Sequence, residues 1–236
     1  MRKFQIILTI IVGAACLAIE ASLVAGLVYA LNIDPPYVVV IDAGHGGRDN
    51  GVSSDFLHEA DINLEISRYI RDELQSRGII VVMTRDDEHS LADGDEPNKK
   101  RADMKRRHDI IERAKPDLAI SIHVNSFPRI PSVHGIQTFF HGESGQPFAE
   151  FIQKHINQTD LCDKDRIAMK GDYFILETAY PSVLIECGFL SNPSDHAKLS
   201  NIEYKQTLAK HLADSIMESL KSTTPIQRLT KWYNLG

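Results

Sequence analysis

The architecture of this chain follows from the sequence Tyr37-Val38-Val39-Val40-Ile41-Asp42-Ala43-Gly44-His45-Gly46-Gly47. Its first five residues form a continuous apolar run rich in β-branched side chains, which is typical of a strand covered on both faces. The glycines on both sides of His45 permit a tight turn directly after that strand. Ligand sites in parallel sheets gather at the carboxyl ends of strands, so this turn is a candidate site.

Further strands and helices alternate along the chain. Residues 61–77 carry apolar side chains at helical spacing and end at Gly78, which predicts a helix. Strands are predicted over residues 79–83, 118–122, 136–140 and 183–187, and further helices over residues 97–115, over residues 147–156 and in a last segment that ends near Leu220. This alternation predicts an α/β fold: a single three-layer domain over residues 37–221, with a mostly parallel central sheet and helices on both faces.

The N-terminal residues 1–31 are apolar and long enough to cross a membrane. Between residues 4 and 31 the one ionisable residue is Glu20, and Arg2 and Lys3 precede this segment. About 20 apolar residues span a bilayer as a helix, and flanking positive residues stay in the cytoplasm. We expect a transmembrane anchor, with a cleaved signal sequence or a buried core helix as alternatives. An anchor or a signal sequence places the domain that follows outside the cytoplasmic membrane.

Composition excludes several classes of protein. The chain has 236 residues, of which 43% are hydrophobic and 25% charged, which excludes a disordered, collagen-like or coiled-coil chain. The formal net charge of −6 is unsuited to neutralising phosphates, so we expect no nucleic-acid partner. Residues 32–36 are predicted to be a linker and residues 222–236 a flexible tail. The sequence leaves open whether Cys162 and Cys187 form a disulfide bond.

Four polar residues lie in positions that suggest chemistry. His45 follows the first predicted strand, His123 ends another, and Glu59 lies at the start of the first long helix. Glu186 is inside an apolar strand, where a carboxylate is costly to bury unless it is paired or functional. Each has a structural explanation when taken alone: a turn histidine, a satisfied core histidine, a helix cap and a buried salt bridge.

Together the four residues fit the plan of a zinc hydrolase. Two histidines and one carboxylate are a common zinc ligand set, and a second carboxylate then serves as the base for a water molecule. The spacing does not form a local motif such as H-E-x-x-H, so it is not specific by itself. Three further histidines are competing ligands, namely His58, His134 and His141.

Five segments carry a family resemblance: VIDAGHGG at 40–47, EADINL at 59–64, MTR at 83–85, SIHVNS at 121–126 and IECGFLSN at 185–192. In order and interval they resemble the zinc-dependent N-acetylmuramoyl-L-alanine amidases, which cleave bacterial cell-wall peptidoglycan. The resemblance implies that one Zn²⁺ is bound by His45, Glu59 and His123, and that Glu186 is the catalytic carboxylate. The family commonly has Pro in place of Ala43 and Lys in place of Ala60, and neither change affects a ligand.

Within that family, the chain looks most like the germination-specific amidases of the spore cortex. That resemblance implies removal of peptides from muramic acid, functionally coupled to a deacetylase that completes muramic-δ-lactam. A vegetative cell-wall amidase and a zinc peptidase acting on stem peptides are alternatives. A wall-binding protein with a vestigial site is the non-enzymatic alternative. Peptidoglycan is the expected partner, and the sequence does not identify an activating protein.

Three further residues are candidates for substrate binding. Arg85 and Arg107 are able to grip substrate carboxylates with paired hydrogen bonds, and they are equally suited to structural ion pairs. Asn125, two residues after His123, is suited to orienting substrate or to capping a loop.

Overall fold

The computed structural model describes Gly13 and residues 36–54, 56–92 and 96–222. The predicted membrane segment at 1–31, the linker at 32–36 and the tail at 222–236 thus lie outside the described residues, apart from Gly13, Pro36 and Ser222. Every described helix falls short of the length or apolar content needed to cross a membrane.

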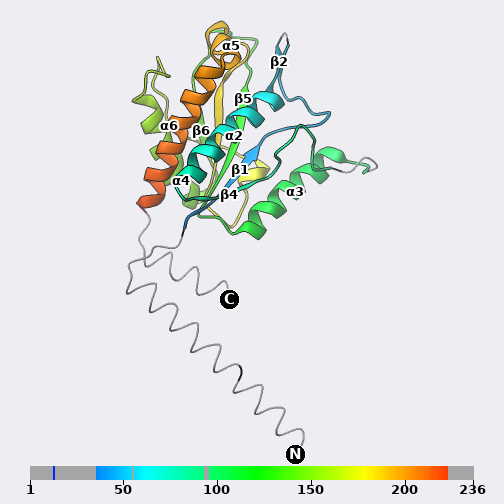
Figure 1. Ribbon diagram of the computed structural model, residues 1–236. Coiled ribbons are helices and arrows are strands. Elements are labelled where there is room, and N and C mark those ends of the chain that lie inside the picture. Colours follow the sequence, from blue (N-terminus) through cyan, green and yellow to red (C-terminus); the bar gives the residue numbers. More distant parts are fainter. Residues whose placement is uncertain (1–12, 14–35, 55, 93–95, 223–236) are drawn as a thin grey trace, which may run out of the picture. The chain divides into compact units, whose positions relative to one another are not determined.

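A six-stranded sheet forms the centre of the domain (Figure 1). The strand order is β4 (Ile80–Met83), β1 (Val38–Ala43), β5 (Leu118–Asn125), β8 (Ser182–Phe189), β6 (Gln137–Phe140) and β7 (Met169–Lys170). The first four run parallel, whereas β6 is antiparallel to β8. A strand that is parallel to the preceding one normally follows a crossover helix. The chain between β5 and β6 contains no helix, which is consistent with the antiparallel direction of β6. The prediction of a mostly parallel sheet is confirmed.

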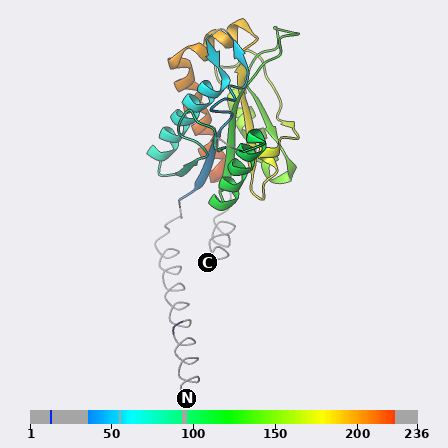
Figure 2. The same ribbon diagram turned by 90° about the vertical axis from the view of Figure 1, so that its right-hand side faces the viewer.

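Helices cover both faces of the sheet, as the sequence predicts (Figure 2). One face is covered by α2 (Glu59–Ser76), α4 (Gly142–Asn157) and α6 (Ile202–Lys221), and α6 packs against both of the others. The other face is covered by α3 (Lys99–Ala114) and by the short 3-10 helix η1 (Phe174–Leu176). The fold is therefore a three-layer α/β domain.

The apolar spacing of α2 and α6 explains their packing. In each helix large apolar side chains recur at every fourth position along one stripe, and these positions are buried in the same core cluster. They are Ile62, Ile66, Ile70 and Leu74 in α2, and Leu208, Leu212, Ile216 and Leu220 in α6. Burying one such side chain contributes about 1.5–3 kcal/mol, so these helices are stabilised mainly by the sheet and by each other.

The structure differs from the predicted elements in a few places. Helix α4 begins at Gly142 rather than at Pro147, which lies inside it. A short hairpin of β2 (Ser53–Ser54) and β3 (Leu57–His58), and the helix α5 (Pro193–Ser200), were not predicted because they are too short to show a hydrophobic period. The described cysteines, Cys162 and Cys187, are both free thiols.

Candidate active site

The structure brings together the three residues proposed as metal ligands. His45 follows β1, Glu59 is the first residue of α2, and His123 lies in β5. One ligand atom from each residue lies within 4.8 Å of the others. Strands β1 and β5 are adjacent and parallel, so their carboxyl ends meet at the same edge of the sheet, as the strand-end argument predicts.

The carboxylate of Glu59 is at the centre of this group. Its Oε1 atom lies 3.3 Å from Nε2 of His45 and 2.9 Å from Nδ1 of His123. Its Oε2 atom accepts a hydrogen bond of 2.9 Å from the backbone N–H of Val52, beside the β2–β3 hairpin. Oε1, which faces both imidazoles, also accepts a hydrogen bond of 3.1 Å from the backbone N–H of Val124, so the backbone holds both oxygens.

The two histidine rings are held in different ways. The backbone of His45 adopts a left-handed conformation with φ of 63°, and its Nδ1 lies 3.0 Å from Oδ2 of Asp49. The ring of His123 instead packs directly against Gly44, where any Cβ atom would overlap it. A glycine is therefore required at position 44 for steric reasons.

Electrostatics favour a charged Glu59. Burial alone would raise the pKa of its carboxyl, but hydrogen bonds and charge interactions with His123 and His45 outweigh burial and hold the pKa well below its usual range. Burial would lower the pKa of His45, but Glu59 and Asp49 outweigh it and raise the pKa. The group therefore presents an anionic oxygen between two imidazoles, which is a donor set suited to Zn²⁺.

Glu186 has the opposite character. Burial, assisted by the nearby charge of Glu59, raises the pKa of Glu186 to about 7. Its side chain is buried in β8, where the residue is 7% exposed, and Oε2 has no hydrogen-bond partner among the described residues. Glu186 pairs with His123 across the β5–β8 ladder. A carboxyl group with a pKa near neutrality beside a metal-ligand set is suited to accept and donate a proton.

A groove with a volume of about 890 Å³ contains this site. His45, His123 and Glu186 line it. Its other walls include Lys99 and Met104 of α3, and Phe174 of η1. Its volume is therefore within the range of about 300–1,000 Å³ that is usual for ligand-binding pockets.

The predicted substrate-binding arginines are buried beneath the His45 turn. Arg85 is 4% exposed and Arg107 is 1% exposed. Arg85 donates to the carbonyl oxygens of Ala43, Gly44 and Ala60. Arg107 donates to the carbonyl oxygens of Ala43 and His45. Of the two interpretations, these contacts favour a structural role in which both arginines fix the turn that carries His45.

Asn125 also has local contacts. Its Oδ1 atom accepts a hydrogen bond of 2.7 Å from the backbone N–H of Ser126, and its carbonyl oxygen accepts one of 2.9 Å from Leu190. These contacts are those of a residue that caps a loop, the second of the two predicted roles.

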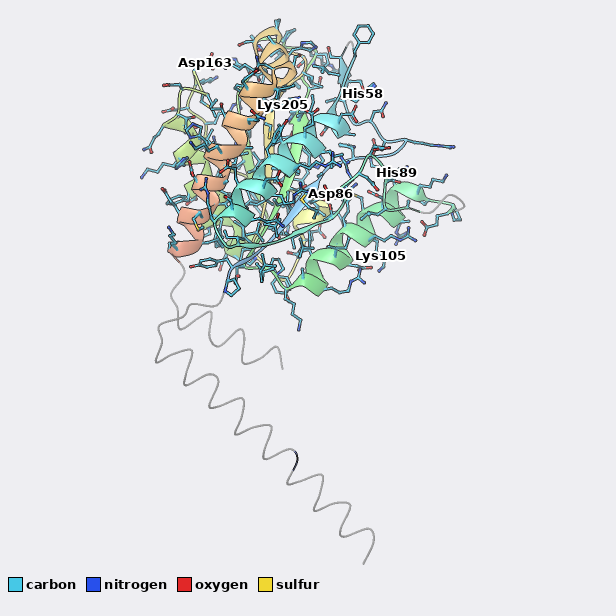
Figure 3. All side chains as sticks on the ribbon, in the orientation of Figure 1. His58, Asp86, His89, Lys105, Asp163 and Lys205 are labelled. Atoms are coloured by element: carbon cyan, nitrogen blue, oxygen red, sulfur yellow. The ribbon has the colours of Figure 1, made fainter. Side chains whose placement is uncertain are left out.

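The competing histidines take no part in the ligand group. His58, labelled beside the start of α2 in Figure 3, bonds through Nδ1 to the hydroxyl of Ser53 at 2.9 Å. His134 and His141 lie near aspartates elsewhere, at 3.5 Å from Asp163 and 3.7 Å from Asp172.

Sequence reasoning missed Asp42 and Asp49. Asp42 is buried at the end of β1 and accepts hydrogen bonds from Thr84, Ser121 and Arg107 at 2.7–2.8 Å. Burial alone would raise its pKa, but Arg107 and the two hydroxyls lower it. A buried aspartate next to the strand end was a visible signal for Asp42. Asp49 lies in an irregular turn. The spacing of residues in the sequence does not indicate that the side chain of Asp49 faces His45.

Comparison with known proteins identifies the class that this fold and site define. Residues 39–218 match the family model described as N-acetylmuramoyl-L-alanine amidase. The chain belongs to this family and is an amidase of the peptidoglycan-cleaving class.

Two curated relatives match most of their own length. The germination-specific N-acetylmuramoyl-L-alanine amidase of Bacillus subtilis is 33% identical over 187 residues, which cover 76% of this chain and 78% of the relative. The uncharacterized protein YqiI of Bacillus subtilis is 36% identical over 183 residues, covering 75% of this chain and 82% of the relative.

A solved structure shares the fold. The CwlD amidase from Clostridioides difficile, determined in complex with the GerS lipoprotein, is 30% identical with a TM-score of 0.76. The match covers 79% of this chain and 100% of that chain.

Proposed function

We propose that this amidase is a single-zinc hydrolase that cleaves the bond between the lactyl group of N-acetylmuramic acid and L-alanine in spore cortex. The observation that carries the zinc assignment is the convergence of His45, Glu59 and His123, whose ligand atoms lie within 4.8 Å of one another. Two imidazoles and one carboxylate leave a fourth position free for water or substrate, as in catalytic zinc sites.

When bound there, a zinc ion supplies Lewis acidity toward the amide carbonyl and toward a water molecule. Glu59, His45 and His123 would hold the ion at the part of the groove that the two histidines line. Glu186, which lines the groove, accepts the proton of the attacking water. It then delivers that proton to the nitrogen of L-alanine, which leaves as an amine.

The raised pKa of Glu186 supports both halves of this role. In the metal-free protein the pKa of Glu186 lies near 7, so this carboxyl holds and releases a proton at similar cost at neutral pH. A carboxylate with an ordinary pKa would be a weaker proton acceptor, because proton affinity falls as pKa falls.

The cortex assignment is supported by the germination-specific relative, which matches this chain over 78% of its own length. In this proposal the product is muramic acid without its peptide. A deacetylase then acts on that product before the lactam ring closes. The vegetative cell wall is the alternative substrate.

In this proposal residues 1–31 are a membrane anchor or a secretion signal. Either one places the domain outside the cytoplasmic membrane. The related CwlD structure holds a lipoprotein, so a protein partner for this chain is part of the proposal.

Digestion of purified cortex and of vegetative wall, followed by mass analysis of the fragments, tests the function. An amidase releases the whole stem peptide with a free amino terminus on L-alanine and leaves a free lactyl carboxyl group on the glycan. Shortened stem peptides would instead show a zinc peptidase, and intact wall would show a binding protein. Release from vegetative wall alone would refute the cortex assignment.

A further inference from the structure

Asp49 lies beside His45, one of the three proposed zinc ligands, but is not itself one of those ligands. His45 is flanked by glycines and its side chain is 20% exposed, so neighbouring side chains confine its ring only in part. Its Nε2 faces Glu59 at 3.3 Å, and its Nδ1 faces Oδ2 of Asp49 at 3.0 Å. The two ring nitrogens therefore have separate partners, one on the metal side and one behind it.

Asp49 is itself fixed in place. Its backbone exchanges two hydrogen bonds with Gly46, of 2.9 and 3.2 Å. Its Oδ1 accepts a hydrogen bond of 3.2 Å from the backbone N–H of Gly51. Its Oδ2 lies 4.0 Å from Nζ of Lys100 at the start of α3. The carboxylate thus has one oxygen held by the turn and the other directed at the imidazole.

We propose that Asp49 is the positioning residue that fixes the ring and the tautomer of His45 for metal binding. The proton on Nδ1 is donated to Asp49, which leaves the lone pair of Nε2 directed toward Glu59. Partners of this kind raise the basicity of a ligating imidazole and prevent it from rotating. The inference rests on the proposed zinc site.

His123 differs from His45 in what lies against its ring, although both side chains are 20% exposed. The ring of His123 packs against Gly44 so closely that a Cβ there would overlap it. Close contact with Gly44 thus restricts the ring of His123 on one side, whereas Asp49 lies against Nδ1 of His45, which is in a glycine-rich turn. The orientations of the two histidines therefore depend on different residues, so a mutation can disturb one histidine without the other.

Zinc affinity tests the proposal without relying on activity. The variants are Asp49→Ala, which removes the acceptor, and Asp49→Asn, which keeps an oxygen but loses the charge. Asp172→Asn is the matched control, because Asp172 also lines the groove and lies 3.7 Å from a histidine, His141, that is not a ligand. The measurements are the zinc dissociation constant by chelator competition, the visible spectrum of the Co²⁺-substituted protein and the melting temperature of each metal-free form.

We expect Asp49→Ala to weaken zinc binding about 10- to 100-fold and Asp49→Asn about 10-fold, with an altered Co²⁺ spectrum in both. Asp172→Asn should match the wild type. Zinc affinity within about two-fold of wild type in Asp49→Ala would overturn the proposal. If that variant does not fold, the same result in Asp49→Asn overturns it. A wild-type protein that binds no zinc would instead refute the proposed zinc site itself.

Discussion

Gly51 lies directly against the carboxylate of Glu59. A Cβ atom at position 51 would overlap Oε2 and crowd the carboxyl carbon, and the backbone of Gly51 has a φ of 64°. The central ligand of the proposed metal site is therefore confined by a residue that has no side chain. The consequence is a sharp mutational test.

Substitution of Gly51 by Ala should reduce zinc affinity at least about ten-fold, because Glu59 must move to admit the methyl group. The control is Gly78→Ala, since Gly78 also has a positive φ, of 80°, but no heavy atom within 4 Å of its Cβ position. Both substitutions force an L-residue into the left-handed region and should each cost about 1–2 kcal/mol of stability. Equal zinc affinity in the two variants would contradict this account of Glu59.

Replacing Glu186 by Gln should separate metal binding from catalysis. Gln keeps the shape of the side chain but cannot accept the proton of water, so kcat should fall by about 10²–10⁴. Zinc content, measured by metal analysis, should stay at the wild-type level because Glu186 is outside the ligand group. Retained turnover would show that another group is the base.

The same residue predicts a pH dependence of stability in the metal-free protein. Folding raises the pKa of Glu186 from 4.5 to about 7, so the folded state holds a proton that the unfolded state has released. The resulting stabilisation is complete below pH 4.5 and is lost as the pH rises through 7, by roughly 3 kcal/mol. Glu186→Gln should therefore melt at a higher temperature than wild type at pH 8, and the difference should shrink toward pH 5.

An exposed glutamate provides the control for that experiment. Glu88→Gln should leave the melting temperature close to wild type at both pH values. A stability difference for Glu186→Gln that does not change with pH would rule out titration of this carboxyl as its cause.

Asp42 should be among the most important residues for stability. Asp42→Asn removes the charge that Arg107 faces in the interior, at 2.8 Å, although Asp103 remains beside that guanidinium. Breaking a buried ion pair costs about 3–5 kcal/mol, and we expect a loss of about 3 kcal/mol by urea unfolding. Asp86→Asn is the control, because Asp86 pairs with arginines at the surface (Figure 3) and should cost less than about 1 kcal/mol.

The sign of the acid dependence follows from the same ion pair. Folding lowers the pKa of Asp42 below its ordinary value of 3.8. Its stabilisation is therefore present above pH 3.8 and is lost as the pH falls through the folded-state value. Wild-type protein should lose stability on acidification over that range more steeply than Asp42→Asn. Parallel acid titrations of the two proteins would contradict the assignment.

Removal of the metal should abolish amidase activity reversibly. A chelator should stop release of stem peptides, and added Zn²⁺ should restore it. The melting temperature should rise with zinc concentration, because a ligand that binds only the folded state stabilises it. Full activity in a protein shown to be metal-free would refute the zinc proposal.

Much of the fold was predictable because long elements repeat a pattern. Four-residue spacing in α2 and continuous apolar runs in β1 and β5 are signals that local sequence carries. Glu186 was conspicuous for the same reason, as a charge inside a buried strand. The short helix α5 showed no period, yet Asn192 and Pro193 carry the signals of a helix start, because Asn192 caps it and Pro193 is its first residue.

The contacts of the site were harder to predict. Arg85 and Arg107 have the residue type of a substrate clamp, and only tertiary structure shows that backbone carbonyls occupy their donors. Asp49 and Gly51 lie in an irregular turn. Its conformation cannot be predicted from the spacing of hydrophobic residues. Local sequence therefore indicated which residues carry chemistry, whereas the residues that support them depend on how distant segments meet.

The pairing of His123 with Glu186 across β5 and β8 has one more consequence. Neighbouring strands lie about 4.8 Å apart, and their hydrogen bonds fix which residues stand opposite one another. The spacing between the proposed metal ligand and the proposed proton-transferring carboxyl is thus set by the backbone of the sheet. Changes in the length and composition of loops around the groove therefore leave the spacing of His123 and Glu186 unaltered.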